Sequence, residues 1–214
     1  ITTFFLITCG AALIFALEFN NPDTIGNMGP GNKILASFFQ SVVLRTAGFM
    51  TFPQSGMYSS TVIVCLFLMF IGGSSISTSG GIKTTTFAVL FLSTRATIKG
   101  STHLVVFNKT IPHKTVQKAL AVTVVSLTAL LIAVFALHLV EGGSLLDATF
   151  ETTSAVATVG LSRDFTATMG MAGKLLITFC MYLGRIGPIS MVIFFNRQQG
   201  SKYFSYPHED ITVG

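Results

Sequence analysis

The residues from Ala119 to Val140 form one apolar run that contains no Asp, Glu, Lys or Arg. A helix needs about 20 apolar residues to cross the hydrocarbon core of a bilayer, so this run is long enough to span a membrane. The whole chain has the same character, because its mean hydropathy is +0.71 and only 10% of its residues are charged. A soluble domain has about 25% charged residues. We therefore expect an all-α integral membrane protein rather than a soluble domain, a disordered tail or a nucleic-acid binder.

Three further segments are candidates for membrane spans. They cover residues 1–19, residues 57–98, which are about twice as long as one crossing, and residues 168–199. The chain opens inside an apolar run, with neither an initiator Met nor a basic stretch before it, unlike a signal peptide. We expect that the sequence starts partway into a membrane helix and that further segments precede it.

Two shorter helical segments lie between the spans, at residues 33–44 and 145–156. About 12 residues of helix rise only some 18 Å, which is too little to cross a bilayer. Such segments are typical of re-entrant helices, which are tolerated where they are buried in protein or line a water-filled cavity. The order span, half-span, span therefore occurs twice along the chain.

The two halves also align without gaps at one constant offset, which sets Ala36 against Ala148. At this offset both half-spans end on the same Thr-x-Gly tract, Thr46-Ala47-Gly48 and Thr158-Val159-Gly160. The other identical pairs of the alignment are Phe38/Phe150, Met57/Met169, Phe67/Phe179, Met69/Met181 and Gly72/Gly184. This self-similarity indicates an internal repeat.

A short helix followed by Thr-x-Gly has the chemistry of a cation filter. The carbonyl end of the helix carries the negative end of its dipole, and the extended backbone beyond it can point carbonyl oxygens at a dehydrated ion. Glycine suits such a tract because it reaches positive φ freely. We expect ion-binding segments at Thr46, Ala47 and Gly48 and at Thr158, Val159 and Gly160. The alternative is that these glycines only close a helix or allow close packing.

The long segment at residues 57–98 is interrupted by the glycine-serine loop, GGSSISTSGG at residues 72–81. Its four glycines and five hydroxyl residues would break a helix, and lipid would leave its backbone unsatisfied. The loop must therefore line a pore or pack against protein, unless it is a simple helix kink or a flexible cytoplasmic loop. The neighbouring SGGIKTTT is not a phosphate-binding loop, since Ile82 separates the glycine from Lys83.

The basic residues predict the orientation. The segment that joins the two repeats contains no acid, and its bases are Arg95, Lys99, Lys109, Lys114 and Lys118. By the positive-inside rule this segment is cytoplasmic, as are both ends of the chain. The acids Glu18, Asp23, Glu141, Asp147 and Asp164 then lie on the outer side, where an acidic mouth suits a cation.

Four motifs taken together resemble one family. SVVLRTAGF at 41–49, GGSSISTSGGIKTTT at 72–86, TSAVATVGLS at 153–162 and MYLGRIGP at 181–188 are similar to the last two repeats of the Trk/Ktr/HKT potassium transporter superfamily, in particular to a bacterial Ktr membrane subunit. The resemblance runs over essentially the whole chain. It implies half of a four-repeat pore, with two membrane-pore-membrane repeats, in a multi-pass protein of the plasma membrane.

The resemblance also implies a division of the chain. Residues 1–98 are the third pore repeat, with a span at 1–19, a pore helix at 33–44, a filter at 45–49 and a broken span at 57–98. Residues 99–113 are a cytoplasmic connection, in which residues 104–107 favour a short hairpin strand. Residues 114–199 are the fourth pore repeat, with a span at 114–140, a pore helix at 145–156, a filter at 157–162 and a span at 168–199, and residues 200–214 are a tail.

The family's gate maps onto the glycine-serine loop and onto Arg185. The expected gate residues are Gly72, Gly73, Ser74, Ser75, Ser77, Thr78, Ser79, Gly80, Gly81 and Arg185. A charge inside a span is costly and is functional by default, and the family has a basic residue at this place that faces the gate loop. The alternative is that Arg185 snorkels to the interface. Arg45 is expected to point behind the filter, with Glu151 as a candidate partner.

The transported substrate is expected to be potassium, and no organic cofactor is expected in this chain. The resemblance implies four partners: an N-terminal half with two more repeats, a second copy in a homodimer, a cytoplasmic ring of nucleotide-binding regulatory subunits, and membrane lipid. Rival hypotheses are a sodium-permeable relative, a non-conducting structural subunit, and a membrane enzyme using His138, Cys180 or Asp147. The cysteines Cys9, Cys65 and Cys180 lack metal or disulfide spacing and are expected to be small buried hydrophobes.

Overall fold

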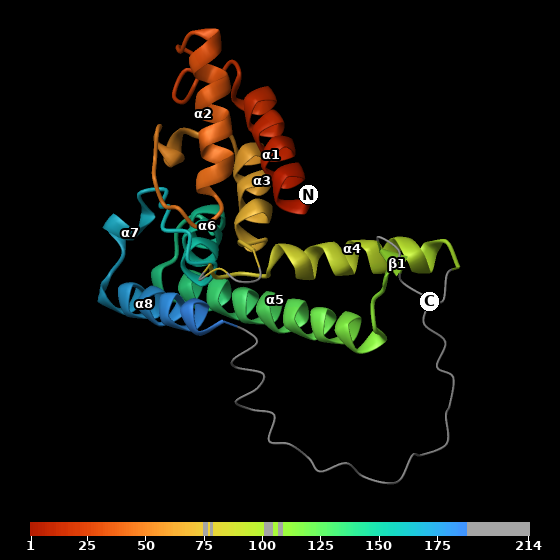
Figure 1. Ribbon diagram of the computed structural model, residues 1–214. Coiled ribbons are helices and arrows are strands. Elements are labelled where there is room, and N and C mark those ends of the chain that lie inside the picture. Colours follow the sequence, from red (N-terminus) through yellow and green to blue (C-terminus); the bar gives the residue numbers. More distant parts are fainter. Residues whose placement is uncertain (75–76, 78, 101–104, 107–108, 188–214) are drawn as a thin grey trace.

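The computed structural model describes residues 1–74, 77, 79–100, 105–106 and 109–187. The described chain is helical apart from one short hairpin (Figure 1). Its elements are α1 Thr2–Glu18, α2 Pro30–Val43, a 3-10 turn at Gln54–Gly56, α3 Ser59–Phe70, α4 Thr84–Ile98, β1 Val105–Val106, β2 Lys109–Thr110, α5 His113–Glu141, α6 Leu145–Val156, α7 Phe165–Thr168 and α8 Met171–Ile186.

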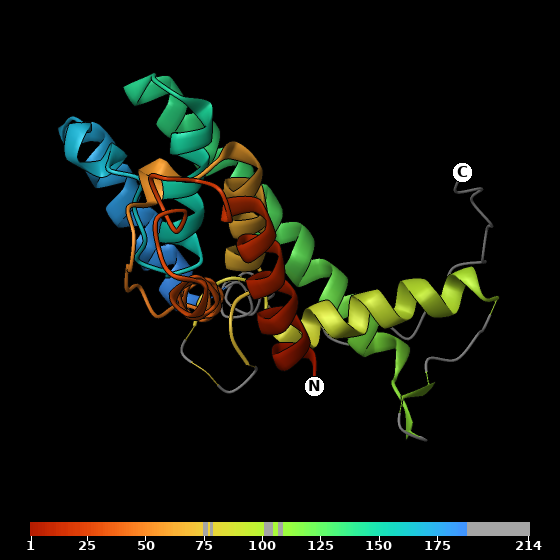
Figure 2. The same cartoon turned by 90° about the horizontal axis from the view of Figure 1, so that it is seen from above.

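In the N-terminal half, α1 packs against both α2 and α3. Helix α2 begins at Pro30, three residues before the expected start at Lys33, because Pro30 occupies the first turn and Gly29 caps it with extended backbone. In Figure 2 this helix is seen nearly end-on, beside the tilted α1. The helices place the end of α2 next to the end of α3, where the glycine-serine loop begins.

In the C-terminal half, α6 lies between the other helices and packs against α5, α8 and α3 (Figure 1). Its bounds coincide with the expected half-span at 145–156. Helix α5 is the one helix of the described residues that is long and apolar enough to cross a membrane. The short helix α7 was not expected, and the part of the expected last span beyond residue 187, together with the tail at 200–214, lies outside the described residues.

The expected long span at 57–98 is broken in two by the glycine-serine loop. Helix α3 ends at Phe70 and α4 begins at Thr84, and α4 packs against α5 rather than continuing along α3. Seen from above, the far end of α4 extends away from α1, α2, α3, α6 and α8 (Figure 2). The connection after α4 contains an antiparallel hairpin, in which Val105 pairs with Thr110 and Val106 with Lys109. Residues 104 and 107 of the expected strand lie outside the described residues.

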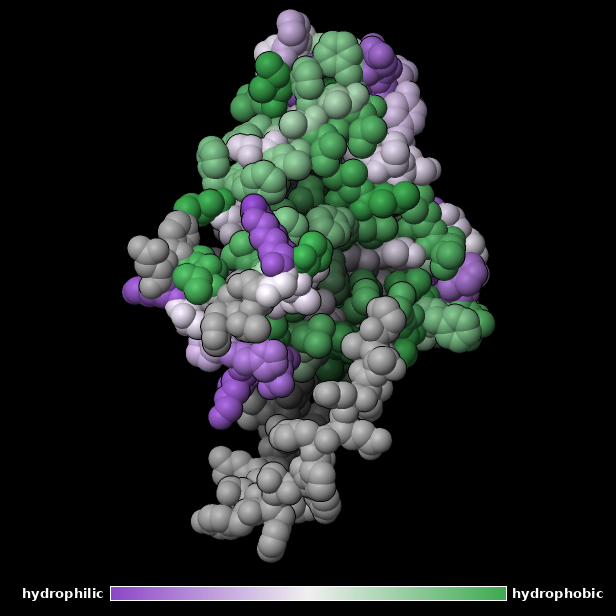
Figure 3. Space-filling model, turned by 90° about the vertical axis from the view of Figure 1, so that its right-hand side faces the viewer, coloured by the Kyte–Doolittle hydropathy of each residue, from purple (hydrophilic) through white to green (hydrophobic). Residues whose placement is uncertain are grey.

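The buried core consists of a larger cluster that spans both halves of the chain and a smaller cluster within the C-terminal half. Its larger part joins side chains of α1, α3 and the tract after α6, such as Ile14, Met69 and Leu161, which are all nearly inaccessible. Much apolar surface remains exposed, and Figure 3 shows apolar residues over most of one face. On α5 the exposed apolar side chains include Leu131, Ile132 and Phe135. An apolar surface of this kind indicates contact with lipid or with other protein.

The cysteines correct one expectation. Cys65 and Cys180 are buried, but Cys9 is exposed. Cys9 lies on a face of α1 that also exposes Phe5 and Leu13, so its surroundings are apolar even though it is not covered.

A buried or half-buried glutamate closes each half in the same way. Glu18, at the end of α1, accepts a hydrogen bond from the backbone N–H of Tyr58, which precedes α3, at 3.0 Å. Glu141, at the end of α5, accepts one from the N–H of Gly170, which precedes α8, at 2.8 Å. Tyr58 and Gly170 are aligned by the repeat offset, so the donors of the two contacts correspond, whereas the two glutamates are not aligned by that offset. Each carboxylate satisfies N–H groups that a helix start leaves unpaired.

Candidate functional site

The two Thr-x-Gly tracts adopt the same unusual backbone. Thr46 has a φ of 71° and Thr158 of 56°, while Gly48 has a φ of 75° and Gly160 of 87°. Left-handed backbone is rare for a β-branched residue and is found chiefly where the surroundings enforce it. In each tract the first and third residues therefore have left-handed backbone, and the two tracts leave the helix with the same pattern of φ angles. The offset that aligns the two sequences thus also aligns their backbone geometry.

The two tracts also face each other. A Cβ atom added to Gly160 would lie 3.6 Å from Gly48 Cα, and one added to Gly48 would lie only 2.8 Å from the carbonyl oxygen of Val159. A side chain at Gly48 would thus collide with the opposite tract as well as requiring a strained φ. The structure therefore brings together the glycines that the sequence singled out, and it leaves no room for a side chain at Gly48.

The C-terminal tract is held more firmly than the N-terminal one. Val159 N–H donates to Ser154 O at 2.8 Å, and Leu161 N–H donates to Ser154 Oγ at 2.9 Å. In the N-terminal tract Ala47 N–H donates to Val43 O at 3.1 Å, but the residue equivalent to Ser154 is Val42, which has no side-chain acceptor. Sequence reasoning did not single out Ser154, because it ends a run of polar residues, Glu151 to Ser154, and its residue type carries no separate signal there.

The glycine-serine loop is closed at its neck by backbone hydrogen bonds. Gly72 N–H donates to Ile82 O at 2.8 Å, and Ile82 N–H donates to Phe70 O at 3.0 Å. The side chain of Lys83 folds back under the loop and donates to the carbonyls of Ser77 and Ser79. Ser75 and Thr78, both expected gate residues, lie outside the described residues. The described part of the loop is therefore a compact, self-bonded turn and not a simple kink in a helix.

Both ends of the loop are tied to the tracts. Gly80 N–H donates to Thr158 Oγ1 at 2.8 Å, and a Cβ on Gly80 would lie 2.8 Å from the carbonyl of Ala157. At the other end, Arg45 Nη1 donates to the carbonyl of Ile71 at 2.7 Å and to that of Gly72 at 3.1 Å. The loop therefore packs directly against the C-terminal tract and is held by the arginine of the N-terminal one.

The expected pairing of Arg45 with Glu151 is wrong. Glu151 is buried, and its carboxylate accepts hydrogen bonds from Ser162 Oγ, from Arg163 N–H at 2.9 Å and from Thr166 Oγ1 at 2.8 Å. Arg45 points instead toward the loop carbonyls. A carbonyl at a helix end is a strong acceptor for a guanidinium. These carbonyls engage only Nη1, and Nε and Nη2 of Arg45 are buried without a hydrogen-bond partner among the described residues.

Arg185 lies in the last turn of α8 and is exposed. It lines a cavity that is also bordered by Thr158 and Gly160 of the C-terminal tract and by Glu151. The structure thus places the only arginine of α8 beside one of the two tracts. His138, by contrast, is far along α5, and its Nδ1 is buried without a hydrogen-bond partner among the described residues.

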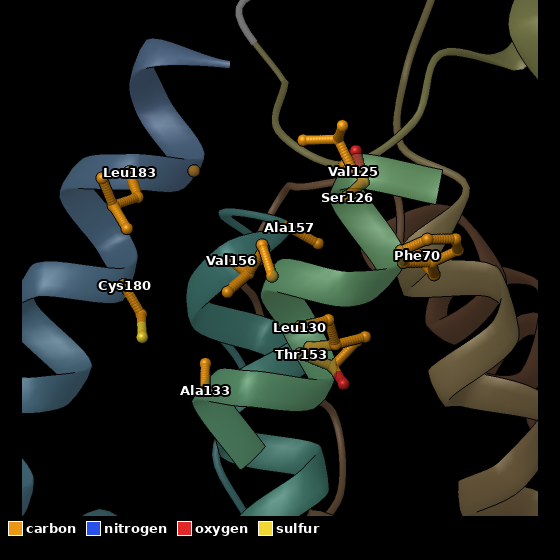
Figure 4. Close-up of a pocket in the computed structure, with 13 residues that line it drawn as sticks. Phe70, Val125, Ser126, Leu130, Ala133, Thr153, Val156, Ala157, Cys180 and Leu183 are labelled. Atoms are coloured by element: carbon orange, nitrogen blue, oxygen red, sulfur yellow. The ribbon is translucent and has the colours of Figure 1, made fainter. Parts of the chain in front are cut away.

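A second cavity lies behind the C-terminal tract and is lined mainly by apolar side chains. Figure 4 shows Cys180 and Leu183 of α8 on one side of it and Val156, Ala133 and Leu130 on the other. Gly81 of the loop also borders it. Its apolar lining makes it unsuitable for an ion. The polar groups that could contact an ion belong instead to the two Thr-x-Gly tracts and the glycine-serine loop.

Comparison with known proteins decides the family. A family model described as "TrkH: Cation transport protein" matches residues 1–206. The chain belongs to the TrkH family of cation transport proteins. Membership implies a location in a membrane and a transporter rather than an enzyme.

Two relatives of this chain carry the name of a potassium uptake protein. The chain is 40% identical to Ktr system potassium uptake protein B of Bacillus subtilis over 94% of its own length and 45% of that protein. It is 39% identical to the protein of the same name from Vibrio alginolyticus over 100% and 47% of the two lengths. The chain thus spans about half the length of the curated relatives it matches.

The fold matches a solved structure of the same family. The chain resembles the crystal structure of the potassium transporter TrkH from Vibrio parahaemolyticus with a TM-score of 0.75 and 20% identity. The match covers 91% of this chain and 43% of the other. At this identity the likeness establishes the fold.

Proposed function

We propose that this chain supplies two of the four filter segments of a potassium uptake protein. The observation that carries the proposal is the matched geometry of the two Thr-x-Gly tracts, in which Thr46 and Thr158 share left-handed backbone and the glycines face each other. Alternating left-handed residues turn successive carbonyls to one side, as a carbonyl-lined filter requires. The names of the two relatives support potassium as the ion.

In this proposal residues 1–98 and 114–199 are the third and fourth pore repeats, and α2 and α6 are their pore helices. Relatives about twice as long as this chain support two further repeats that complete the ring. The protein is then multi-pass in the plasma membrane, with the ends of this segment in the cytoplasm. A second copy, lipid and a nucleotide-binding ring at the basic connection are its proposed partners.

The glycine-serine loop is the proposed gate, and it acts together with Arg185. The loop lies against the proposed filter at Thr158, is anchored by Arg45 and is bonded across its neck. A segment in this position blocks the path below the filter until its contacts with the filter break. Arg185 adds a positive charge beside the same filter, which raises the barrier to a cation.

The proposal is tested by potassium and sodium flux into liposomes that contain the full-length protein. Gly160→Ser is expected to abolish the preference for potassium, because serine disfavours a φ of 87° by roughly 1–2 kcal/mol and displaces the filter carbonyls. The matched control is Gly100→Ser. Gly100 has a φ of 69° but lies at the end of α4 with no atom near its added Cβ, so the same substitution should leave selectivity unchanged.

The outcomes separate the rival hypotheses. Potassium-selective flux that loses selectivity only in Gly160→Ser supports the proposal. Equal potassium and sodium flux in the wild type would instead identify a sodium-permeable transporter. Flux that is unaffected by Gly160→Ser would remove this glycine from the conduction path and favour a structural subunit.

A further inference from the structure

Arg163 joins the two proposed filter repeats on the outer side. It follows Gly160 by three residues, and its side chain is only 10% exposed. Its Nε donates to Asp147 Oδ1 of α6 at 2.7 Å, forming an ion pair within its own repeat. Its Nη1 donates to the carbonyl of Gln54 in the other repeat at 2.8 Å. One guanidinium therefore bridges two segments that are far apart in sequence.

The bridge continues to the pore helix of the N-terminal repeat. Gln54 is buried, and its side chain is bonded to that of Gln40 on α2, with Gln40 Nε2 donating to Gln54 Oε1 at 2.6 Å. Beside it, Ser55 Oγ donates to Asp164 Oδ2 at 2.9 Å. A continuous polar path thus leads from α2 through Gln40, Gln54 and Arg163 to α6.

Both the backbone and the guanidinium of Arg163 are also held in place by α6. Its N–H donates to the buried carboxylate of Glu151 at 2.9 Å, and its guanidinium lies over the ring of Phe150 at 6.0 Å. Both of these residues belong to α6, so the side chain has little freedom to leave the bridge. The planar fork of arginine can serve a carboxylate and a carbonyl at once, which a lysine ammonium does less well.

The repeat offset places Thr51 at the equivalent position of the N-terminal repeat. Threonine is too short to form such a bridge, so Arg163 is a feature of one junction and not of the repeat itself. Its role is therefore specific to the contact between the C-terminal filter segment and the N-terminal repeat.

We infer that Arg163 is a positioning residue that fixes the spacing between the filter segments at Gly48 and Gly160, and thereby the selectivity of the pore, without contacting the ion. This inference rests on the proposed function. The ion pair with Asp147 compensates the charge of Arg163, so its presence near a cation path carries little repulsion. Filter carbonyls discriminate between ions by their separation and their number, and a bridge that spans both pore helices sets that separation.

The test compares Arg163→Gln with Lys174→Gln in the full-length protein in liposomes. Lys174 is an exposed cation near the start of α8, on the same outer side, and it is the matched control for loss of positive charge. Arg163→Gln is expected to lower the ratio of potassium to sodium flux about tenfold, the effect of losing charge-assisted hydrogen bonds. Lys174→Gln should leave the ratio unchanged.

Two further variants keep the inference falsifiable. Arg163→Lys retains the charge but not the fork, and should recover part of the lost selectivity. Asp147→Asn should lower selectivity by itself and should add little to Arg163→Gln in the double variant, because the two residues act as a unit. If Arg163→Gln does not fold, Arg163→Lys and Asp147→Asn still decide the question.

The alternative is a purely electrostatic role at the mouth. In that case Arg163→Gln would lower the KM for both ions and leave their flux ratio intact, which would overturn the inference. Failure of the inference is distinguishable from failure of the proposed function. If Gly160→Ser changes selectivity and Arg163→Gln does not, the filter assignment stands and only the positioning role of Arg163 falls.

Discussion

The backbone N–H of Gly80 donates a hydrogen bond of 2.8 Å to the side-chain oxygen of Thr158, so the proposed gate of one repeat is latched to the proposed filter of the next. The hydroxyl of Thr158 is thus engaged by the glycine-serine loop, which leaves its carbonyl free to serve the proposed filter. The proposed gate and the proposed filter are therefore in direct contact, and we expect a change in one to affect the other.

Loss of the Thr158 hydroxyl is expected to loosen the gate. Thr158→Val preserves shape and β-branching but removes the acceptor for Gly80 N–H, which costs about 1 kcal/mol and shifts the closed-to-open balance about fivefold. The basal potassium leak from loaded liposomes should rise by that factor. Thr158→Ser should remain close to wild type.

The matched control for this substitution is Thr46→Val. Thr46 has the same left-handed backbone in the other repeat, and among the described residues its hydroxyl makes no hydrogen bond to the loop. An equal rise of the leak in Thr46→Val would show that valine disturbs the filter itself, and would refute the latch.

Arg45 is expected to hold the other end of the gate. Arg45→Met removes two hydrogen bonds from a guanidinium to the carbonyls of Ile71 and Gly72, at a cost of about 2–3 kcal/mol. The leak should rise and the thermal unfolding temperature in detergent should fall. Arg95→Met, an exposed arginine on α4, is the control, and a wild-type leak in Arg45→Met would contradict the anchor.

The two closing glutamates are expected to differ in their contribution to stability. Glu18 is fully buried and accepts from Asn21 Nδ2 at 2.6 Å, Thr24 Oγ1 at 2.7 Å and Tyr58 N–H, so Glu18→Gln should lower the free energy of unfolding by about 2 kcal/mol. Glu141 is half-buried, and Glu141→Gln should cost less than about 1 kcal/mol. Thermal unfolding of both variants measures the difference, and the reverse order would be inconsistent with this packing.

Gly184 is expected to be intolerant of any side chain. A Cβ there would overlap the carbonyl of Val156, with 2.8 Å to the carbonyl carbon, so Gly184→Ala should destabilise the packing of α8 on α6 by about 1–3 kcal/mol. Gly31→Ala, also in a helix but with no atom within 4 Å of its added Cβ, should be neutral or stabilising. Equal melting temperatures for the two variants would disprove the close approach.

The sequence predicted those parts of the molecule that depend on local pattern. The apolar run around Ala119 predicts the helix α5, the length of residues 145–156 matches α6, and the glycines and serines at 72–81 predict a break between α3 and α4. These features follow from helix propensity and from hydrophobic length, which each segment carries by itself.

Contacts between segments were beyond the reach of the sequence. The direction of Arg45 depends on where the glycine-serine loop folds, and pattern alone offered Glu151 as a partner when the true acceptors are backbone carbonyls. Thr46 and Thr158 have left-handed backbone, which a β-branched residue rarely adopts, so residue propensity does not predict this conformation. Arg163 was overlooked for a related reason, since its side-chain partners, the carboxylate of Asp147 and the carbonyl of Gln54, lie 16 and 109 residues away in the sequence.

The carboxylates of Glu18 and Glu141 also bear on biosynthesis. Glu18 joins the end of α1 to the start of α3, and Glu141 joins the end of α5 to the start of α8, in each case across the proposed pore helix that lies between them in sequence. The donor to Glu18 is Tyr58, so the hydrogen bond that closes the N-terminal half is available to a nascent chain before any residue of α5 has been synthesised. Membrane insertion can therefore proceed one half at a time, whereas the contacts that join the halves, among them the Gly80–Thr158 hydrogen bond and the bridge at Arg163, must wait for the second half to emerge.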